Sequence, residues 1–278
     1  MQANLQPCLS GEALMKQKTV QRDTALLKQL ISAPADIYQQ LYLKTLHAVL
    51  ELCQAIPQDI TQSKPYSFMQ NQLDLTITAL KLRRGKLLPT NANSETIAEQ
   101  EPLWTYALFS ACLLYKLDRI QAVGYIELYK NPSEKLGLWH PVAGSLAEPT
   151  TYYSITAEKN TLILDKKAFQ SILIGKLIPT VALRWLAQYP TVFQDWQAVI
   201  VEHAQPNNPL QILIQHALDA INQHATHNPP EQEDNTPKRA ANASKQVKSY
   251  TRKNSPDRKN KKRNKQCGAK NKADDSAQ

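Results

Sequence analysis

Cysteine is scarce in this sequence, and none of it is clustered. The four cysteines, Cys8, Cys53, Cys112 and Cys267, lie far apart along 278 residues. Zinc sites use closely spaced cysteine pairs, and small secreted domains use dense disulfide frameworks, so this spacing is typical of neither class. We therefore predict free thiols in a reducing compartment.

Long apolar runs are also absent. No stretch approaches 18 uninterrupted apolar residues, and residues 1–17, MQANLQPCLSGEALMKQ, have no apolar run behind a basic start. A membrane-spanning helix needs about 20 largely apolar residues, and a secretory leader needs an apolar segment after its basic start. These absences predict a soluble, cytoplasmic protein without a membrane partner.

Excess positive charge is confined to the C-terminal end. The chain has 33 basic and 24 acidic residues and a net charge of +9, but residues 231–278 hold 14 basic and 6 acidic residues. This end of the chain has almost no large apolar residue apart from Val247 and Tyr250, so it cannot bury enough surface to fold alone. We predict a flexible N-terminus (1–22), a folded domain (23–227) and a disordered basic tail (228–278).

A flexible cationic arm binds phosphates by counterion release without reading sequence, so DNA is the predicted partner of the tail. The predicted contacts there are Tyr250, which would stack on a base, and Lys259, Lys261, Lys262, Arg263 and Lys265. A tail that only aids solubility is the alternative, because aromatic residues are not interleaved repeatedly with the basic ones.

Apolar residues at helical spacing predict a mainly α fold. One stripe runs through Trp104, Leu108, Ala111, Cys112 and Tyr115 and is typical of a core helix. The predicted helices cover residues 26–31, 37–56, 68–82, 94–117 as one or two segments, 169–177, 181–189, 192–202 and 210–221. A small sheet is predicted from a strand at 122–129, a turn at Asn131-Pro132 and a β-hairpin over 150–164.

A basic turn follows the predicted helix at 68–82. It contains Lys81, Arg83, Arg84 and Lys86. Cations near a helix C-terminus can simply stabilise the helix dipole. The more specific alternative is that these cations contact phosphates of a nucleic acid, so all four residues are candidate nucleic-acid ligands.

Four blocks between Ala79 and Ser145 suggest a family. They read ALKLRRGKLLP, LWTYALFSACLLYKLDRI, IELYK and WHPVAGSL. Together they resemble the N-terminal domain of the MobH (TraI-type) conjugative relaxases, over roughly residues 20 to 225. The resemblance implies an HD-domain-like helical bundle with a small β insertion, and DNA and relaxosome or conjugation proteins as partners.

The resemblance also implies a degenerate metal centre. Where the family carries a His-Asp pair, this chain has Tyr115 and Lys116. The other family ligand positions fall at Asn71, at Lys166 or a neighbour, and at Leu218, although a one-residue slip would place Asp219 at the last of them. Tyr115 and Lys116 could equally just end an amphipathic helix, with the tyrosine packed and the lysine in water.

A hydrolytic metal centre needs neutral imidazoles and carboxylates around a cation that acidifies water, and Lys116 would instead add positive charge. We therefore predict no metal, no cofactor and no catalytic residue, and a relaxase-like accessory protein that binds DNA or relaxosome partners. One alternative is a DNA-nicking phosphodiesterase with Tyr115 as nucleophile. Its available carboxylates would be Asp74, Asp118, Asp165 and Asp219. Another alternative is a protein-interaction scaffold.

Overall fold

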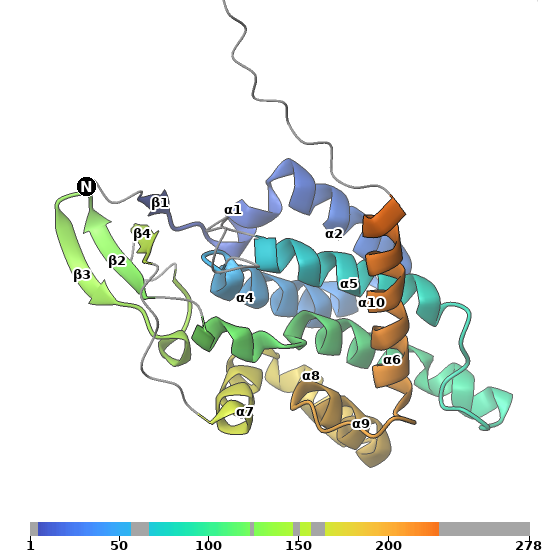
Figure 1. The fold of residues 1–278 in the computed structure, drawn as a ribbon. Coiled ribbons are helices and arrows are strands. Elements are labelled where there is room, and N and C mark those ends of the chain that lie inside the picture. Colours follow the sequence, from blue (N-terminus) through green and yellow to red (C-terminus); the bar gives the residue numbers. More distant parts are fainter. Residues whose placement is uncertain (1–4, 57–66, 123–124, 147–150, 157–164, 228–278) are drawn as a thin grey trace, which may run out of the picture. The chain divides into compact units, whose positions relative to one another are not determined.

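Helix α6 (Ser94–Leu114) lies at the centre of the helical domain and packs against α4, α5, α8, α9 and α10 (Figure 1). The computed structural model describes residues 5–56, 67–122, 125–146, 151–156 and 165–227. Every residue of α6 from Leu103 to Leu114 is buried except Thr105, and a helix apolar around its circumference is a core helix. The sequence predicted either one or two helical segments over residues 94–117. The structure has a single helix over most of this range, and Pro102 lies within it.

Helices make up most of the described chain, which confirms the predicted mainly α class. Helix α5 contacts α2, α6 and α10, and α9 packs on α6. The remaining helices are α1 (Gly11–Met15), α2 (Lys18–Ile31), α3 (Ala35–Ile37), η1 (Tyr38–Leu43), α4 (Lys44–Cys53), α5 (Ser67–Arg83), η2 (Leu117–Ala122), η3 (Pro141–Ala143), α7 (Lys166–Leu177), α8 (Thr180–Ala187), α9 (Pro190–Ile200) and α10 (Pro209–His227). No helix among the described residues is long and apolar enough to span a bilayer.

Residues 5–22, which we expected to be flexible, are folded onto α4. The Gln54 side chain accepts a hydrogen bond from Leu9 N (2.8 Å) and donates one to Leu9 O (2.9 Å). Leu14 and Val20 are buried in the main core. Gly11 lies so close to α4 that a Cβ there would be 2.9 Å from His47 O, so only glycine allows this approach. The sequence signal was weak because only a few apolar residues anchor this segment.

The predicted sheet is present, with four antiparallel strands in the order β1-β4-β2-β3. The strands are β1 (Gln6–Pro7), β2 (Ile126–Asn131), β3 (Glu134–Leu138) and β4 (Tyr152–Ile155). Its hairpin lies elsewhere than expected: β2 and β3 pair across the Asn131-Pro132 turn, where Ser133 N donates to Asn131 Oδ1 (3.0 Å). β4 pairs with β1 and β2, and residues 157–164 lie outside the described part of the chain.

The sheet is fixed to the helices through a second small core. Ala55, Ile126, Leu146 and Tyr153 are buried together, and Trp139 packs against both this cluster and the main core. The Tyr153 hydroxyl donates to Gln54 O (3.3 Å) at the end of α4. The end of α4 therefore contacts both the N-terminal segment and the sheet.

A π-helical segment, η1, interrupts the helical run from α3 to α4. Such segments leave a backbone carbonyl without its usual α-helical partner. The Thr45 hydroxyl donates to Leu41 O (2.8 Å), and because its single proton is used there, Tyr106 of α6 donates its hydroxyl to Thr45 Oγ1 (2.9 Å). Thr45 thus stabilises the π segment and joins it to the core helix.

Replacing Thr45 by valine should lower the free energy of unfolding by about 1–3 kcal/mol, because the isosteric change removes two buried hydrogen bonds and leaves the Tyr106 hydroxyl without this partner. Urea unfolding of the full chain measures this. The matched control is Thr24→Val, because the half-buried Thr24 hydroxyl makes only one bond, to Val20 O (2.7 Å). Its expected loss is below about 1 kcal/mol. Equal losses in the two variants would contradict the proposed role of Thr45.

Candidate functional site

Two segments far apart in the sequence, α5 and α10, meet the end of α6 around a cavity of about 270 Å³. We call it the α5–α10 pocket. Its lining residues are Phe68, Asn71, Gln72, Asp74 and Leu75 of α5, Tyr115, Lys116 and Arg119 after α6, and Leu218, Ile221 and Asn222 of α10. Four of the five predicted ligand positions, Asn71, Tyr115, Lys116 and Leu218, therefore lie around one cavity.

The chain leaves α6 in a fixed conformation at Tyr115 and Lys116. Tyr115 is extended, and Lys116 has a φ of +53°, in the left-handed region that costs a side-chain-bearing residue roughly 1 kcal/mol. The buried Gln72 amide of α5 donates to Tyr115 O (2.5 Å) and to Leu113 O (3.4 Å). Gln72 thus satisfies carbonyls that the end of α6 leaves without partners.

The Lys116 side chain lies over its neighbour's ring. Its Nζ is 5.3 Å from the centre of the Tyr115 ring, a cation–π contact, and the tyrosine itself is buried. This arrangement departs from the simple helix end considered for the sequence, in which the lysine extends into water. Both side chains instead belong to the pocket lining.

The predicted position at Lys166 lies outside this pocket. Lys166 begins α7 and forms ion pairs with Asp118 (3.2 Å) and Glu202 (2.6 Å). Asp118 follows Lys116 by two residues but is turned toward Lys166, and it does not line the pocket. The ion pairs explain this placement, because they hold the carboxylate on the α7 side of η2.

The two candidate positions on α10, Leu218 and Asp219, lie in different places. Leu218 lines the pocket, whereas Asp219 accepts a hydrogen bond from Gln215 (2.9 Å) on the same helix and does not line it. Successive residues on an α-helix are about 100° apart, so a slip of one residue points the side chain elsewhere. Asp165, another candidate carboxylate, caps the N-terminus of α7 by accepting from Ala168 N (3.0 Å).

The pocket has one acidic side chain, Asp74, which sequence reasoning named only as an available carboxylate. Gln70 donates both to the buried Asp23 (2.8 Å) and to Asp74 (3.4 Å), so one amide bridges two carboxylates. Arg22 pairs with Asp23 (3.0 Å). Burial raises the pKa of Asp74 above 3.8, and the charge of Asp23 raises it further, against the opposing hydrogen bond from Gln70.

The basic turn after α5 offers fewer surface cations than its sequence indicates. Lys81 and Lys86 are exposed, and the exposed Arg84 donates to Gln29 O (2.9 Å). Arg83 is buried, donates to Lys86 O (2.5 Å), and has its pKa lowered by that burial. Its guanidinium therefore faces the protein interior rather than solvent. The tail residues from Tyr250 to Lys265 lie outside the described residues.

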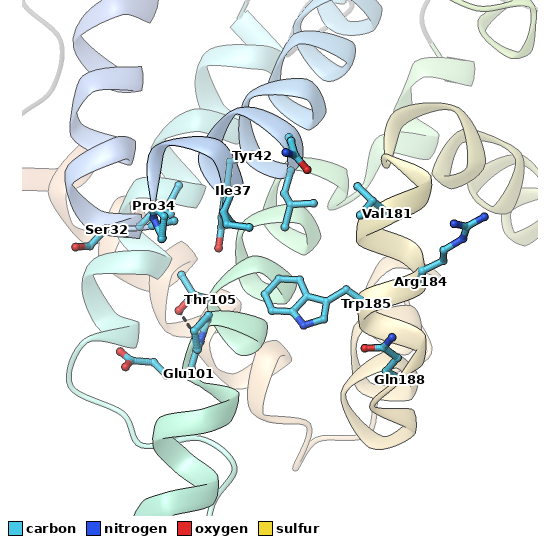
Figure 2. A pocket seen from close by; sticks show the side chains of 15 residues that line it. Ser32, Pro34, Ile37, Tyr42, Glu101, Thr105, Val181, Arg184, Trp185 and Gln188 are labelled. Carbon is cyan, nitrogen blue, oxygen red and sulfur yellow. Dashed lines mark hydrogen bonds between the residues drawn. The ribbon is translucent and has the colours of Figure 1, made fainter.

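A second, larger cavity of about 840 Å³ lies between the α2–α3 turn, η1, α6 and α8. Figure 2 shows the indole of Trp185 pointing into it from α8, while Arg184 points away. The lining is mostly apolar and aromatic, and its volume falls in the range of small-molecule sites. None of the five predicted ligand positions lines this cavity, so the family-derived site and this larger cavity are different places.

The described residues form a helical domain with a small antiparallel sheet and a pocket at the end of α6, and the family match assigns this domain to the TraI-type, relaxase-related class. A family model, TraI_2, described as "Putative helicase", matches residues 6–249, and the chain belongs to this family. The match covers most of the 278 residues. Comparison with curated proteins gives no match.

The structure adds three polar pocket residues that were not named as site residues from the sequence. Arg119 lies one turn after Lys116, and Asn222 lies one turn after Leu218, so helical spacing from the family positions was a usable signal for both. Gln72 follows Asn71 directly, and nothing in its sequence context indicated that its amide would hold the end of α6.

Replacing Asp74 by asparagine should stabilise the protein at neutral pH. Because the folded-state pKa is raised, the folded chain binds more protons than the unfolded chain just above pH 3.8, and stability falls as the pH rises through this window. Asp74→Asn removes that loss. The expected gain in the free energy of unfolding is below about 1 kcal/mol, because the side chain is partly solvated. Urea unfolding from pH 3.5 to 7 measures it.

The control for this measurement is Asp36→Asn, which changes an exposed aspartate on α3. We expect the gain of Asp74→Asn to disappear below pH 3.8, where the aspartate is protonated in both states. A gain that persists at that pH, or the same gain from Asp36→Asn, would show that the charge of Asp74 is not its cause.

Proposed function

We propose that this chain is a catalytically inactive relative of the N-terminal domain of MobH relaxases and serves as an accessory protein in DNA transfer by a conjugative or integrative element. The observation that carries the proposal is the lining of the α5–α10 pocket. At the positions where the family carries metal-binding His and Asp residues, the pocket presents Asn71, Tyr115, Lys116 and Leu218. The partners in this proposal are DNA and relaxosome proteins.

These side chains do not fit a catalytic divalent metal. Leu218 has no donor atom, Lys116 is a cation, and neither Asn71 nor Tyr115 is one of the imidazole or carboxylate ligands that such a metal needs. Asp74 is the single carboxylate of the lining, and it already accepts a hydrogen bond from Gln70. Lewis-acid activation of water needs several anionic or imidazole ligands together, so the proposal contains no metal-dependent step.

Neighbouring carboxylates do not compensate for the exchanged ligands. Asp118 is paired with Lys166, Asp165 caps α7, and Asp219 lies on another face of α10. The family description names a helicase, but this sequence has no G-x-x-x-x-G-K-[ST] phosphate loop, and the proposal contains no ATP-driven step.

Nicking of supercoiled plasmid by the full chain tests this proposal. With Mg²⁺ or Mn²⁺ we expect no relaxed or open-circular product, because no side-chain set in the pocket activates water or a nucleophile. A TraI-type relaxase that carries the His-Asp pair serves as the positive control in the same buffer. Metal-dependent nicking that is lost in Tyr115→Phe would instead establish a phosphodiesterase with Tyr115 as nucleophile.

DNA binding should be electrostatic and should depend on the tail. Changing Lys259, Lys261, Lys262, Arg263 and Lys265 to glutamine in the full chain removes five positive charges. If all five contact phosphates of duplex DNA, the slope of log K against log salt should become shallower by about 4 to 5. Fluorescence anisotropy with a labelled duplex, titrated at several salt concentrations, measures the slope.

The matched control changes the exposed Lys81 and Lys86 of the basic turn to glutamine. We expect a change in slope below about 2, because at most two phosphate contacts are removed. If this pair removes most of the salt dependence and the tail variant does not, the DNA interface lies on the basic turn. Salt-independent or undetectable DNA binding would favour the protein-interaction scaffold.

A further inference from the structure

The α5–α10 pocket contains two cations without acidic partners. Lys116 and Arg119 both line it, and neither forms an ion pair with a described residue. By contrast, Lys135 pairs with Glu127 (2.5 Å), and Lys166 pairs with two carboxylates. Two unpaired cations at one concave site attract an anion, because low-dielectric walls strengthen their joint field.

The position of Lys116 is held by the fold. Its backbone lies in the left-handed region, where glycine or asparagine is accommodated more readily, and the Gln72 amide fixes the preceding carbonyl at 2.5 Å. Its Nζ stays near the Tyr115 ring, 5.3 Å from the ring centre. The left-handed conformation ends α6, and together with these contacts it fixes where the lysine side chain leaves the backbone.

Arg119 and two amides complete the donor set. The backbone N–H of Arg119 donates to Lys116 O (3.2 Å), which couples the two cationic residues in one turn. Asn71 of α5 and Asn222 of α10 line the pocket from the other two sides, and each amide supplies donors to an anion. Asp74 carries the one negative charge of the lining and opposes anion binding.

We propose that the α5–α10 pocket binds a terminal phosphate monoester, as found on a nucleotide or at the end of a DNA single strand, with Lys116 and Arg119 as its charged ligands. A phosphate monoester carries a charge of about −1.5 to −2 at pH 7, which matches two cations better than a singly charged phosphodiester does. A cavity of about 270 Å³ accommodates a phosphate with part of its nucleoside. A DNA duplex is too wide to enter it.

This inference rests on the proposed function, because it requires that the pocket holds phosphate without a metal. Where a metal-dependent relative would neutralise phosphate with a divalent ion, the same charge is supplied here by lysine and arginine side chains. Arginine matches phosphate oxygens with two parallel N–H donors, and lysine adds a point charge. No bond is made or broken, so the site is a binding site only.

Isothermal titration calorimetry on the full chain tests it, in EDTA and in a phosphate-free buffer of low ionic strength. The probes are inorganic phosphate, thymidine 5′-phosphate, and a tetrathymidylate with either a 5′-phosphate or a 5′-hydroxyl. We expect thymidine 5′-phosphate and the 5′-phosphorylated tetramer to bind. The 5′-hydroxyl tetramer should bind at least about tenfold more weakly, because it lacks the terminal phosphate and its charge-assisted hydrogen bonds. Stronger binding of the mononucleotide than of the tetramer would assign the site to free nucleotides rather than strand ends.

Three variants separate the pocket from the tail and from misfolding. Lys116→Asn should weaken thymidine 5′-phosphate binding about tenfold or more while leaving the melting temperature unchanged or higher, because asparagine suits the left-handed backbone. Asp74→Asn should tighten binding severalfold, because it removes the opposing charge. Lys81→Asn, a change at an exposed lysine outside the pocket, should have no effect.

Equal affinity of the chain and of its Lys116→Asn variant for thymidine 5′-phosphate would overturn the inference and leave the proposed function intact. Binding that appears only when Mg²⁺ or Mn²⁺ replaces EDTA would overturn both, since it would reveal a metal in the pocket. The two proposals therefore fail in different ways.

Discussion

Burial of the C-terminal half of α6, from Leu103 to Leu114, is the constraint on which the rest of the structure depends. A helical segment without a solvent face must satisfy every polar group it carries through its neighbours. Ser110 accepts a hydrogen bond from the Trp196 indole (2.9 Å) and donates to Tyr106 O (2.8 Å), so the polar residue at the centre of α6 also positions α9. Tyr106 bonds Thr45 and so positions α4. The surrounding helices are placed by hydrogen bonds as well as by apolar contact.

The same constraint determines where the candidate site lies. Where α6 ends, its last carbonyls would be buried without partners, and the Gln72 side-chain amide of α5 donates hydrogen bonds to two of them. The chain then turns sharply at Lys116 and continues as η2. Residues at this turn lie between α5 and α10 and line the pocket. The pocket therefore arises from how the three helices meet, independently of which side chains line it. The chemistry is set by those side chains, and here two of them, Lys116 and Arg119, are cations.

Helix existence and the fold class were predictable from the sequence because core helices leave a clear apolar period. The continuity of α6 through Pro102 was not, because proline usually marks a boundary and only the surrounding packing shows that the helix continues. The pairing of β4 with β1 and β2 joins strands far apart in the sequence, so local pattern could not find it. Burial of Arg83 likewise depends on tertiary contacts that a run of basic residues does not reveal.

The pocket was predictable only in part. Periodicity alone does not bring Asn71 and Leu218 together across nearly 150 residues; the family frame proposed both positions, and the structure places them around one cavity. The family resemblance also predicted Lys166 or a neighbour as a ligand position. Lys166 lies outside the pocket, where it forms ion pairs with Asp118 and Glu202. Arg119 lies within the block that resembles the family, but at none of the family's metal-binding positions, so the resemblance did not single it out.

The π-helical segment has a consequence for comparing this chain with its relatives. A π turn holds one more residue than an α turn, and one residue rotates everything after it by about 100°. Residues on the two sides of Tyr38–Leu43 therefore follow two different helical phases, although the helical run is continuous from Ala35 to Cys53. An alignment that counts in uniform helical turns across this segment places the core positions of α4 one residue out of register, and a single-residue gap within it restores them.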